Sequence, residues 1–101
     1  MKTNTVTIAK TIKLYEPGDV VYDVVLRQFF FLANRTPEYD HLVKPGNETF
    51  SAFRLVGRRF CEPRVISQDP EKENDEDTIR YVGTLYDYWE GLDSGRLTVR
   101  M

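Results

Sequence analysis

The sequence predicts an α+β domain built on a small antiparallel sheet of about four or five strands, with one longer and one short helix. Three observations favour this class: a period-two pattern near the N-terminus, a helix-start signal in the middle, and short alternating segments separated by turn residues in the C-terminal half. The predicted order is an N-terminal strand, then the helices, then a half rich in β-hairpins. A chain of 101 residues is too short to divide into two cores, so residues 1–101 are expected to form a single domain.

The N-terminal segment 5–14 alternates polar and apolar residues, with valine, isoleucine and leucine at even positions and mostly threonine at odd ones. A period of two predicts a half-buried strand. The turn sequence 16–19 ends this strand, because proline lacks the N–H that a ladder needs and glycine readily adopts unusual backbone angles.

The segment 20–34 fits two different elements. Its valines and phenylalanines favour a strand, whereas its polar residues recur at about four-residue spacing and favour a helix, which is the interpretation we adopt. The helix would gather on one face Val21, Val25, Phe29 and Leu32. The alternative is a second strand that forms a hairpin across the Pro-Gly turn. That strand would place on one face Tyr22, Val24, Leu26 and Phe30.

The remaining elements follow from turn and capping signals. Thr36-Pro37-Glu38 predicts the start of a short helix that runs to about Val43. Segment 48–61 could carry a helical stripe of phenylalanine and valine, but its alternation favours a strand. Segments 64–68 and 78–88 read as the two strands of a long hairpin, and segment 96–100 as a short final strand.

Composition restricts the class of protein. Hydrophobic residues make up 41% and aromatic residues 13% of the chain, which is enough to form a core. A net charge of −2 gives no overall attraction to nucleic acid or membrane. The N-terminus lacks a signal-peptide pattern, and the longest apolar stretch is interrupted by charges and too short for a membrane span. Together with the single cysteine, these features predict a cytoplasmic location.

Candidate catalytic residues are few, since His41 is the only histidine and Cys61 the only cysteine. Nearby Arg58, Arg59 and Arg64 would favour the Cys61 thiolate, but a lone cysteine between apolar residues more often packs as a small hydrophobic residue. His41 lies among acids that could simply solvate it, so a surface or partly buried histidine is favoured over a catalytic one. Glycine-rich phosphate loops are absent from the sequence. The sequence therefore predicts a protein that is not an enzyme and has no cofactor.

The segment 69–77 contains six acidic residues and one lysine. It includes the consecutive acids Asp75, Glu76 and Asp77, but it lacks the spacing and the glycine of a calcium loop, so no metal site is predicted. Two interpretations remain: a solvated hairpin tip that keeps a sheet edge soluble, or an electrostatic contact for a basic partner surface.

Positive charge gathers just before this segment, in Arg54, Arg58, Arg59 and Arg64. On a single strand, three of these arginines share a face and Arg59 points to the other. They could neutralise the phosphates of a nucleic acid or pair with acids on a neighbouring strand, and the second interpretation is favoured.

An aromatic group closes the predicted hairpin: Tyr81, Tyr86, Tyr88 and Trp89. In a strand, Tyr86 and Tyr88 would share a face and Trp89 would turn away, so some aromatic surface is expected to be exposed. Exposed tyrosine and tryptophan suit a protein interface or a base-stacking platform.

Together these features predict a non-catalytic module that binds another protein, or a second copy of itself, as an accessory or inhibitor. The expected contact surface comprises Tyr86, Tyr88, Trp89, Asp75, Glu76 and Asp77. Small regulators carried by phages or mobile elements often have this profile. The alternative is nucleic-acid or nucleotide binding through the arginine stretch, and no membrane partner is expected.

Overall fold

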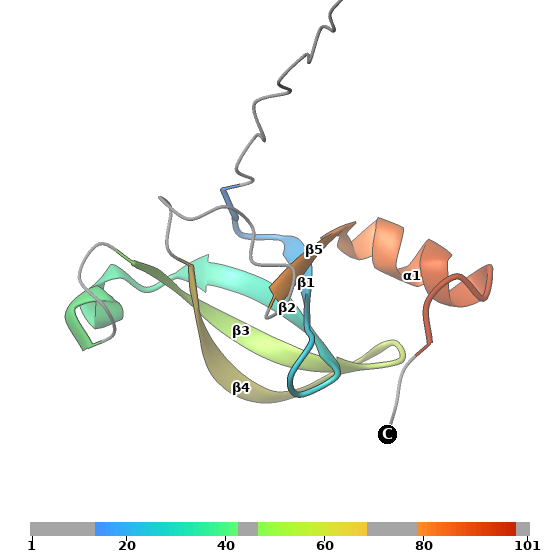
Figure 1. The fold of residues 1–101 in the computed structure, drawn as a ribbon, viewed down its shortest axis with the longest axis horizontal. Helices are drawn as coiled ribbons and strands as arrows, with labels where there is room; N and C mark the ends of the chain where they lie inside the picture. The colour runs from blue at the N-terminus through green and yellow to red at the C-terminus, as the bar shows by residue number, and fades with distance from the viewer. Residues whose placement is uncertain (1–13, 43–46, 69–78, 99–101) are drawn as a thin grey trace, which may run out of the picture.

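The computed structural model describes residues 14–42, 47–68 and 79–98. In these ranges five strands form one antiparallel sheet, ordered β4-β3-β2-β1-β5, and the helix α1 follows the last strand (Figure 1). The predicted α+β class and antiparallel sheet are confirmed. The predicted order of elements is wrong, because the main helix comes after the strands near the C-terminus.

The predicted helix over 20–34 is wrong. This segment forms a hairpin of β1 (Asp19–Asp23) and β2 (Gln28–Arg35). Two of the polar residues that suggested a helix belong to the turn that joins these strands. Asp23 Oδ1 accepts a 2.8 Å hydrogen bond from the Leu26 N–H, and Arg27 has a positive φ of 58°. The alternative of a strand was right about β structure, but it placed the hairpin turn at the Pro-Gly sequence. It also placed Tyr22 and Phe30 on one face, whereas Tyr22 pairs with Phe29 and so shares a face with that residue.

The next predictions are partly confirmed. The short helix is the 3-10 helix η1 (Pro37–Leu42). The strand predicted over 48–61 divides into β3 (Glu48–Val56) and the start of β4 (Arg59–Gln68), which pair as an antiparallel hairpin. Buried Thr49 ties η1 to β3, because its backbone N–H donates a 2.9 Å hydrogen bond to Asp40 Oδ1.

The predicted long hairpin of 64–68 with 78–88 is wrong. Strand β5 (Ile79–Thr84) pairs with β1, so β4 and β5 lie at opposite edges of the sheet. The second half of the predicted strand is the helix α1 (Leu85–Asp93). Thr84 ends the strand because it forms a capping box: the Asp87 N–H donates to Thr84 Oγ1 at 3.2 Å, and the Thr84 N–H donates to Asp87 Oδ2 at 2.8 Å.

Apolar residues on both faces of the sheet explain the two-sided hydrophobic runs of β1 and β2. On the face that α1 covers, which we call the helix face, the buried cluster is Val20, Phe29, Leu55 and Tyr88. On the far face the buried cluster is Tyr15, Val21, Phe30, Leu32, Phe50, Ala52 and Ile66. The far-face cluster includes Tyr15 because the chain before β1 crosses to the end of β4, where the Tyr15 N–H donates a 2.9 Å hydrogen bond to Gln68 Oε1.

Two further predicted strands fall wholly or partly outside the described residues. Residues 96 and 97 of the predicted final strand form a bend after α1, residue 98 is in no regular element, and residues 99–100 lie outside the described part. The predicted N-terminal strand 5–14 also lies outside it, apart from Leu14, which is not in a strand. Within the described residues, no helix is long and apolar enough to cross a membrane.

Candidate functional site

Five apolar residues form a continuous patch on the helix face, over the β2–β3–β4 end of the sheet. We call this patch the apolar strip, and its residues are Phe31, Phe53, Phe60, Pro63 and Val65. Strand pairing places Phe31 opposite Phe53 and Phe53 opposite Pro63. The Phe60 ring lies 5.3 Å from that of Phe31 and 6.3 Å from that of Phe53, between centroids. All five side chains therefore share one face.

The apolar strip lies at the end of the helix face that α1 does not cover. Phe60 is 50% exposed and Val65 is 53% exposed, although both lie in a strand. The helix contacts β5 and β1, at the other edge of the sheet from β4 (Figure 1). Partly buried Phe31 packs against the buried helix-face cluster. The strip thus continues the core outward to solvent.

The predicted aromatic contact residues separate into different roles. Tyr88 is 0% exposed; its ring centroid lies 5.0 Å from that of Phe29, and its hydroxyl donates a 2.8 Å hydrogen bond to the Gly57 carbonyl. Burial raises the pKa of Tyr88 to about 12, because the charged phenolate is poorly solvated there. Tyr88 therefore anchors α1 to the sheet and is not available as a contact residue.

Trp89 is partly buried and packs against the same cluster. The Arg58 guanidinium lies 5.3 Å from the centre of its ring, and Arg58 Nη2 lies 2.8 Å from Asp93 Oδ2. These contacts join the β3–β4 turn to the end of α1. Trp89 and Arg58, predicted as parts of two separate binding surfaces, are thus brought together by the fold.

Tyr86 alone of these three is freely accessible, at 68% exposure. It lies on the outer side of α1 with the exposed acids Asp87, Glu90 and Asp93. Hydrogen bonds from the Thr84 N–H and hydroxyl hold the pKa of Asp87 below its usual range. An exposed aromatic ring and acidic residues thus lie together on α1, although these acids are not the ones that the sequence analysis singled out. The acids Asp75, Glu76 and Asp77 lie outside the described residues.

The predicted basic stretch is divided among several ion pairs. Arg54 Nε lies 2.8 Å from Glu62 Oε1, and Arg64 Nη2 lies 3.7 Å from the same oxygen. The hydrogen bond from Arg54 lowers the pKa of Glu62 and raises that of the guanidinium. Arg54 and Arg64 lie on the far face, opposite Phe30 and Ala52 respectively, whereas Arg58 lies in the β3–β4 turn and Arg59 begins β4.

The two candidate reactive residues lie in different elements of the fold. Cys61 is a partly buried free thiol in β4, whereas His41 lies in η1 with its side chain outside the described part. Among the described residues, no group of three or more histidine, cysteine, aspartate and glutamate side chains could hold a metal ion.

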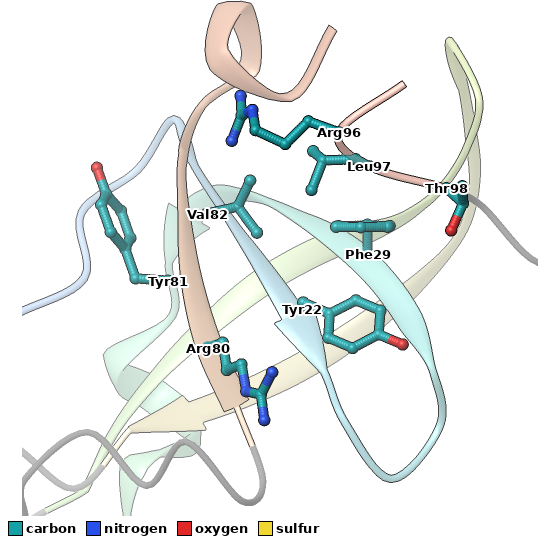
Figure 2. Close-up of a pocket in the computed structure, with 8 residues that line it drawn as sticks. All are labelled: Tyr22, Phe29, Arg80, Tyr81, Val82, Arg96, Leu97 and Thr98. Atoms are coloured by element: carbon teal, nitrogen blue, oxygen red, sulfur yellow. The ribbon is translucent and has the colours of Figure 1, made fainter. Parts of the chain in front are cut away.

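A cavity of about 360 Å³ opens on the helix face, at the edge of the sheet away from the apolar strip (Figure 2). It lies between strands β1, β2 and β5 and the segment 96–98 that follows α1. Its lining residues are Tyr22, Phe29, Arg80, Tyr81, Val82, Arg96, Leu97 and Thr98. Tyr81 belongs to the aromatic group noted in the sequence, and it points away from the other lining side chains in Figure 2.

Sequence reasoning missed both the strip and the cavity. The alternation of Pro63 and Val65 could have indicated one face of the strip, but only the pairing of β2, β3 and β4 adds the three phenylalanines. The chain matches no protein-family model, no curated protein and no solved structure.

Proposed function

We propose that this protein is a non-catalytic module that binds another protein through the apolar strip, as an accessory factor or inhibitor. The observation that carries the proposal is the exposure of Phe60 and Val65 beside a close-packed phenylalanine group. Apolar side chains scattered singly over a surface are ordinary, whereas a contiguous patch is typical of an interaction site.

The shape of the strip suits an interface core. Aromatic residues are enriched at the centres of protein interfaces, where they supply large contact areas at low cost in side-chain entropy. Phe60 is already oriented by its ring contacts with Phe31 and Phe53, so little rotamer freedom remains to be lost on binding. We expect a partner with an apolar surface of matching size, surrounded by polar residues.

The edge of β4 offers a less suitable contact. Strand β4 is an edge strand, but Pro63 in its middle lacks the N–H of a continuous ladder. The proposal therefore assigns binding to side chains on the face of the sheet, and not to strand addition at its edge.

The alternative of nucleic-acid binding has less support. Arg54, Arg58 and Arg64 each contact a carboxylate, and a phosphate would have to displace those contacts. Retention on heparin that falls steeply with salt is the measurement that would revive it.

The test compares two surfaces of one folded protein. The tagged chain, a Phe60→Ser/Val65→Ser variant and a Tyr86→Ser variant are each used to purify partners from the native host. We expect one protein to accompany the wild type and the Tyr86 variant in equal amounts, and to be lost from the strip variant. Circular dichroism confirms that all three chains are folded.

The opposite pattern, with loss only in the Tyr86 variant, would move the contact to the outer side of α1 and overturn the assignment to the strip. Sedimentation equilibrium of the same three proteins covers the case in which the partner is a second copy: only the strip variant should then become monomeric. A wild type that is monomeric and retrieves nothing would contradict the proposed function.

A further inference from the structure

The cavity of Figure 2 combines an apolar floor with two cationic side chains. Val82, Phe29 and Leu97 lie in the middle of the view, with Arg96 above them and Arg80 below. The Tyr22 and Phe29 ring centroids are 4.7 Å apart, so the two rings form one aromatic wall. The cavity has a volume of about 360 Å³, which falls in the range of small-molecule pockets, about 300–1,000 Å³.

The fold holds the cavity in place at both sides. Strand pairing sets Tyr22 between Phe29 of β2 and Arg80 of β5. On the other side, the Leu97 N–H donates a 2.9 Å hydrogen bond to the Gly91 carbonyl, which folds the segment 96–98 back against α1.

Gly91 allows this close approach. A Cβ at that position would lie 2.5 Å from Leu97 Cδ1 and 3.1 Å from Arg96 Nη2. The absence of a side chain at Gly91 therefore sets where Leu97 and Arg96 lie relative to the helix. A cavity walled by a sheet and by a segment bonded to a helix is preformed, so binding requires little reorganisation.

The charge of the lining selects the ligand. Its eight described residues include two arginines and no acid. Arg80 also takes part in an interaction within the molecule. The Asp87 carboxylate accepts hydrogen bonds from the Thr84 N–H and hydroxyl, which lower its pKa, and Arg96 helps to lower that pKa.

We infer that this cavity binds a small organic anion that carries an aromatic ring. The anionic group is held by Arg96, and the ring packs against the wall formed by Tyr22 and Phe29, beside Leu97. A guanidinium recognises phosphate, sulfonate and carboxylate groups through charge-assisted hydrogen bonds, and the aromatic wall distinguishes this ligand class from inorganic anions. The inference does not depend on the apolar strip, none of whose five residues lines the cavity.

Phenyl phosphate is a suitable probe, because it carries both features and is small enough for the cavity. Titration into ¹⁵N-labelled protein should shift the amide signals of residues 80–82 and 96–98 in a saturable way, with a Kd of about 1 mM for a ligand of this size. Inorganic phosphate and benzyl alcohol, each carrying one feature, should bind at least about tenfold more weakly.

Arg96→Gln should weaken phenyl phosphate binding about tenfold, because one charged hydrogen bond is removed. Arg59→Gln, on β4 at the far edge of the sheet, is the matched control and should leave the Kd unchanged. Arg96 is exposed, so its replacement should not prevent folding. Equal shifts with inorganic phosphate, equal weakening by the two variants, or shifts scattered away from the cavity would each overturn the inference.

Discussion

Removing the hydroxyl of Tyr88 tests how α1 is attached to the sheet. The Tyr88→Phe variant keeps the buried ring and its contact with Phe29 but removes the 2.8 Å hydrogen bond to the Gly57 carbonyl. Tyr86→Phe is a matched control two residues away on the same helix, because the Tyr86 ring is largely exposed. The pair separates the structural tyrosine from the accessible one.

The magnitude follows from the bond that is lost. A neutral hydrogen bond contributes about 0.5–1.5 kcal/mol, and a partly buried carbonyl left without its donor adds to the cost, so Tyr88→Phe should lower the free energy of unfolding by about 1–2 kcal/mol. A domain of this size loses about 4–8 °C in Tm per kcal/mol. Tyr86→Phe should change the free energy of unfolding by less than about 0.5 kcal/mol.

Urea unfolding followed by far-ultraviolet circular dichroism measures these changes, and Trp89 fluorescence reports separately on α1. Both probes should give the same midpoint if the helix unfolds with the sheet. Equal destabilisation by the two substitutions would refute the assignment of Tyr88 as the anchor. A Tyr88→Phe variant as stable as the wild type would refute it as well.

Two further predictions concern stability. Gly83→Ala should lower the free energy of unfolding by about 2–3 kcal/mol in urea, because Gly83 has a φ of 139° and a Cβ there would lie 2.5 Å from Asp87 Oδ2. Gly95→Ala should lower it by only about 1 kcal/mol, because Gly95 has a φ of 79° but nothing lies within 4 Å of the added Cβ. Equal losses for the two variants would contradict the role of the clash with Asp87. Burial raises the pKa of both Tyr15 and Tyr88 to about 12, with Asp19 adding to the shift at Tyr15. The folded state therefore keeps phenol protons that the unfolded chain releases above pH 10, so stability should be constant just below pH 10 and fall between about pH 10 and 12, by at most about 1.36 kcal/mol per pH unit for each tyrosine. Denaturant titrations across this range check the fall, and Tyr88→Phe should make it shallower.

Local signals in the sequence were reliable where they depend on a few neighbouring residues. The Thr36-Pro37 start of η1 and the alternation in β3 both lead to the observed elements. The capping box at Thr84 and Asp87 is equally local. The tyrosines and tryptophan after it favour a strand, so the sequence pattern predicted a strand there. The capping box nevertheless starts a helix, because its hydrogen bonds outweigh the strand propensity of the residues that follow.

The functional surfaces could not be read in this way, because each is assembled from residues that are distant in the sequence. Tyr86 and Tyr88 differ by two positions, yet the helix exposes one and buries the other. Arg54 and Glu62 neutralise each other only because β3 and β4 pair. The cavity arises where the segment 96–98 returns to strands β1, β2 and β5.

The sequence by itself determined the class of the fold, the turn at Pro17-Gly18 and the amount of apolar material available for a core, since these depend on composition and short-range pattern. The tertiary structure decided which strands are neighbours, that β4 and β5 form opposite edges, and which phenylalanines stay in contact with solvent. The physical reason is that a strand satisfies its hydrogen bonds and buries its side chains only against a partner, and the choice of that partner is a property of the whole chain.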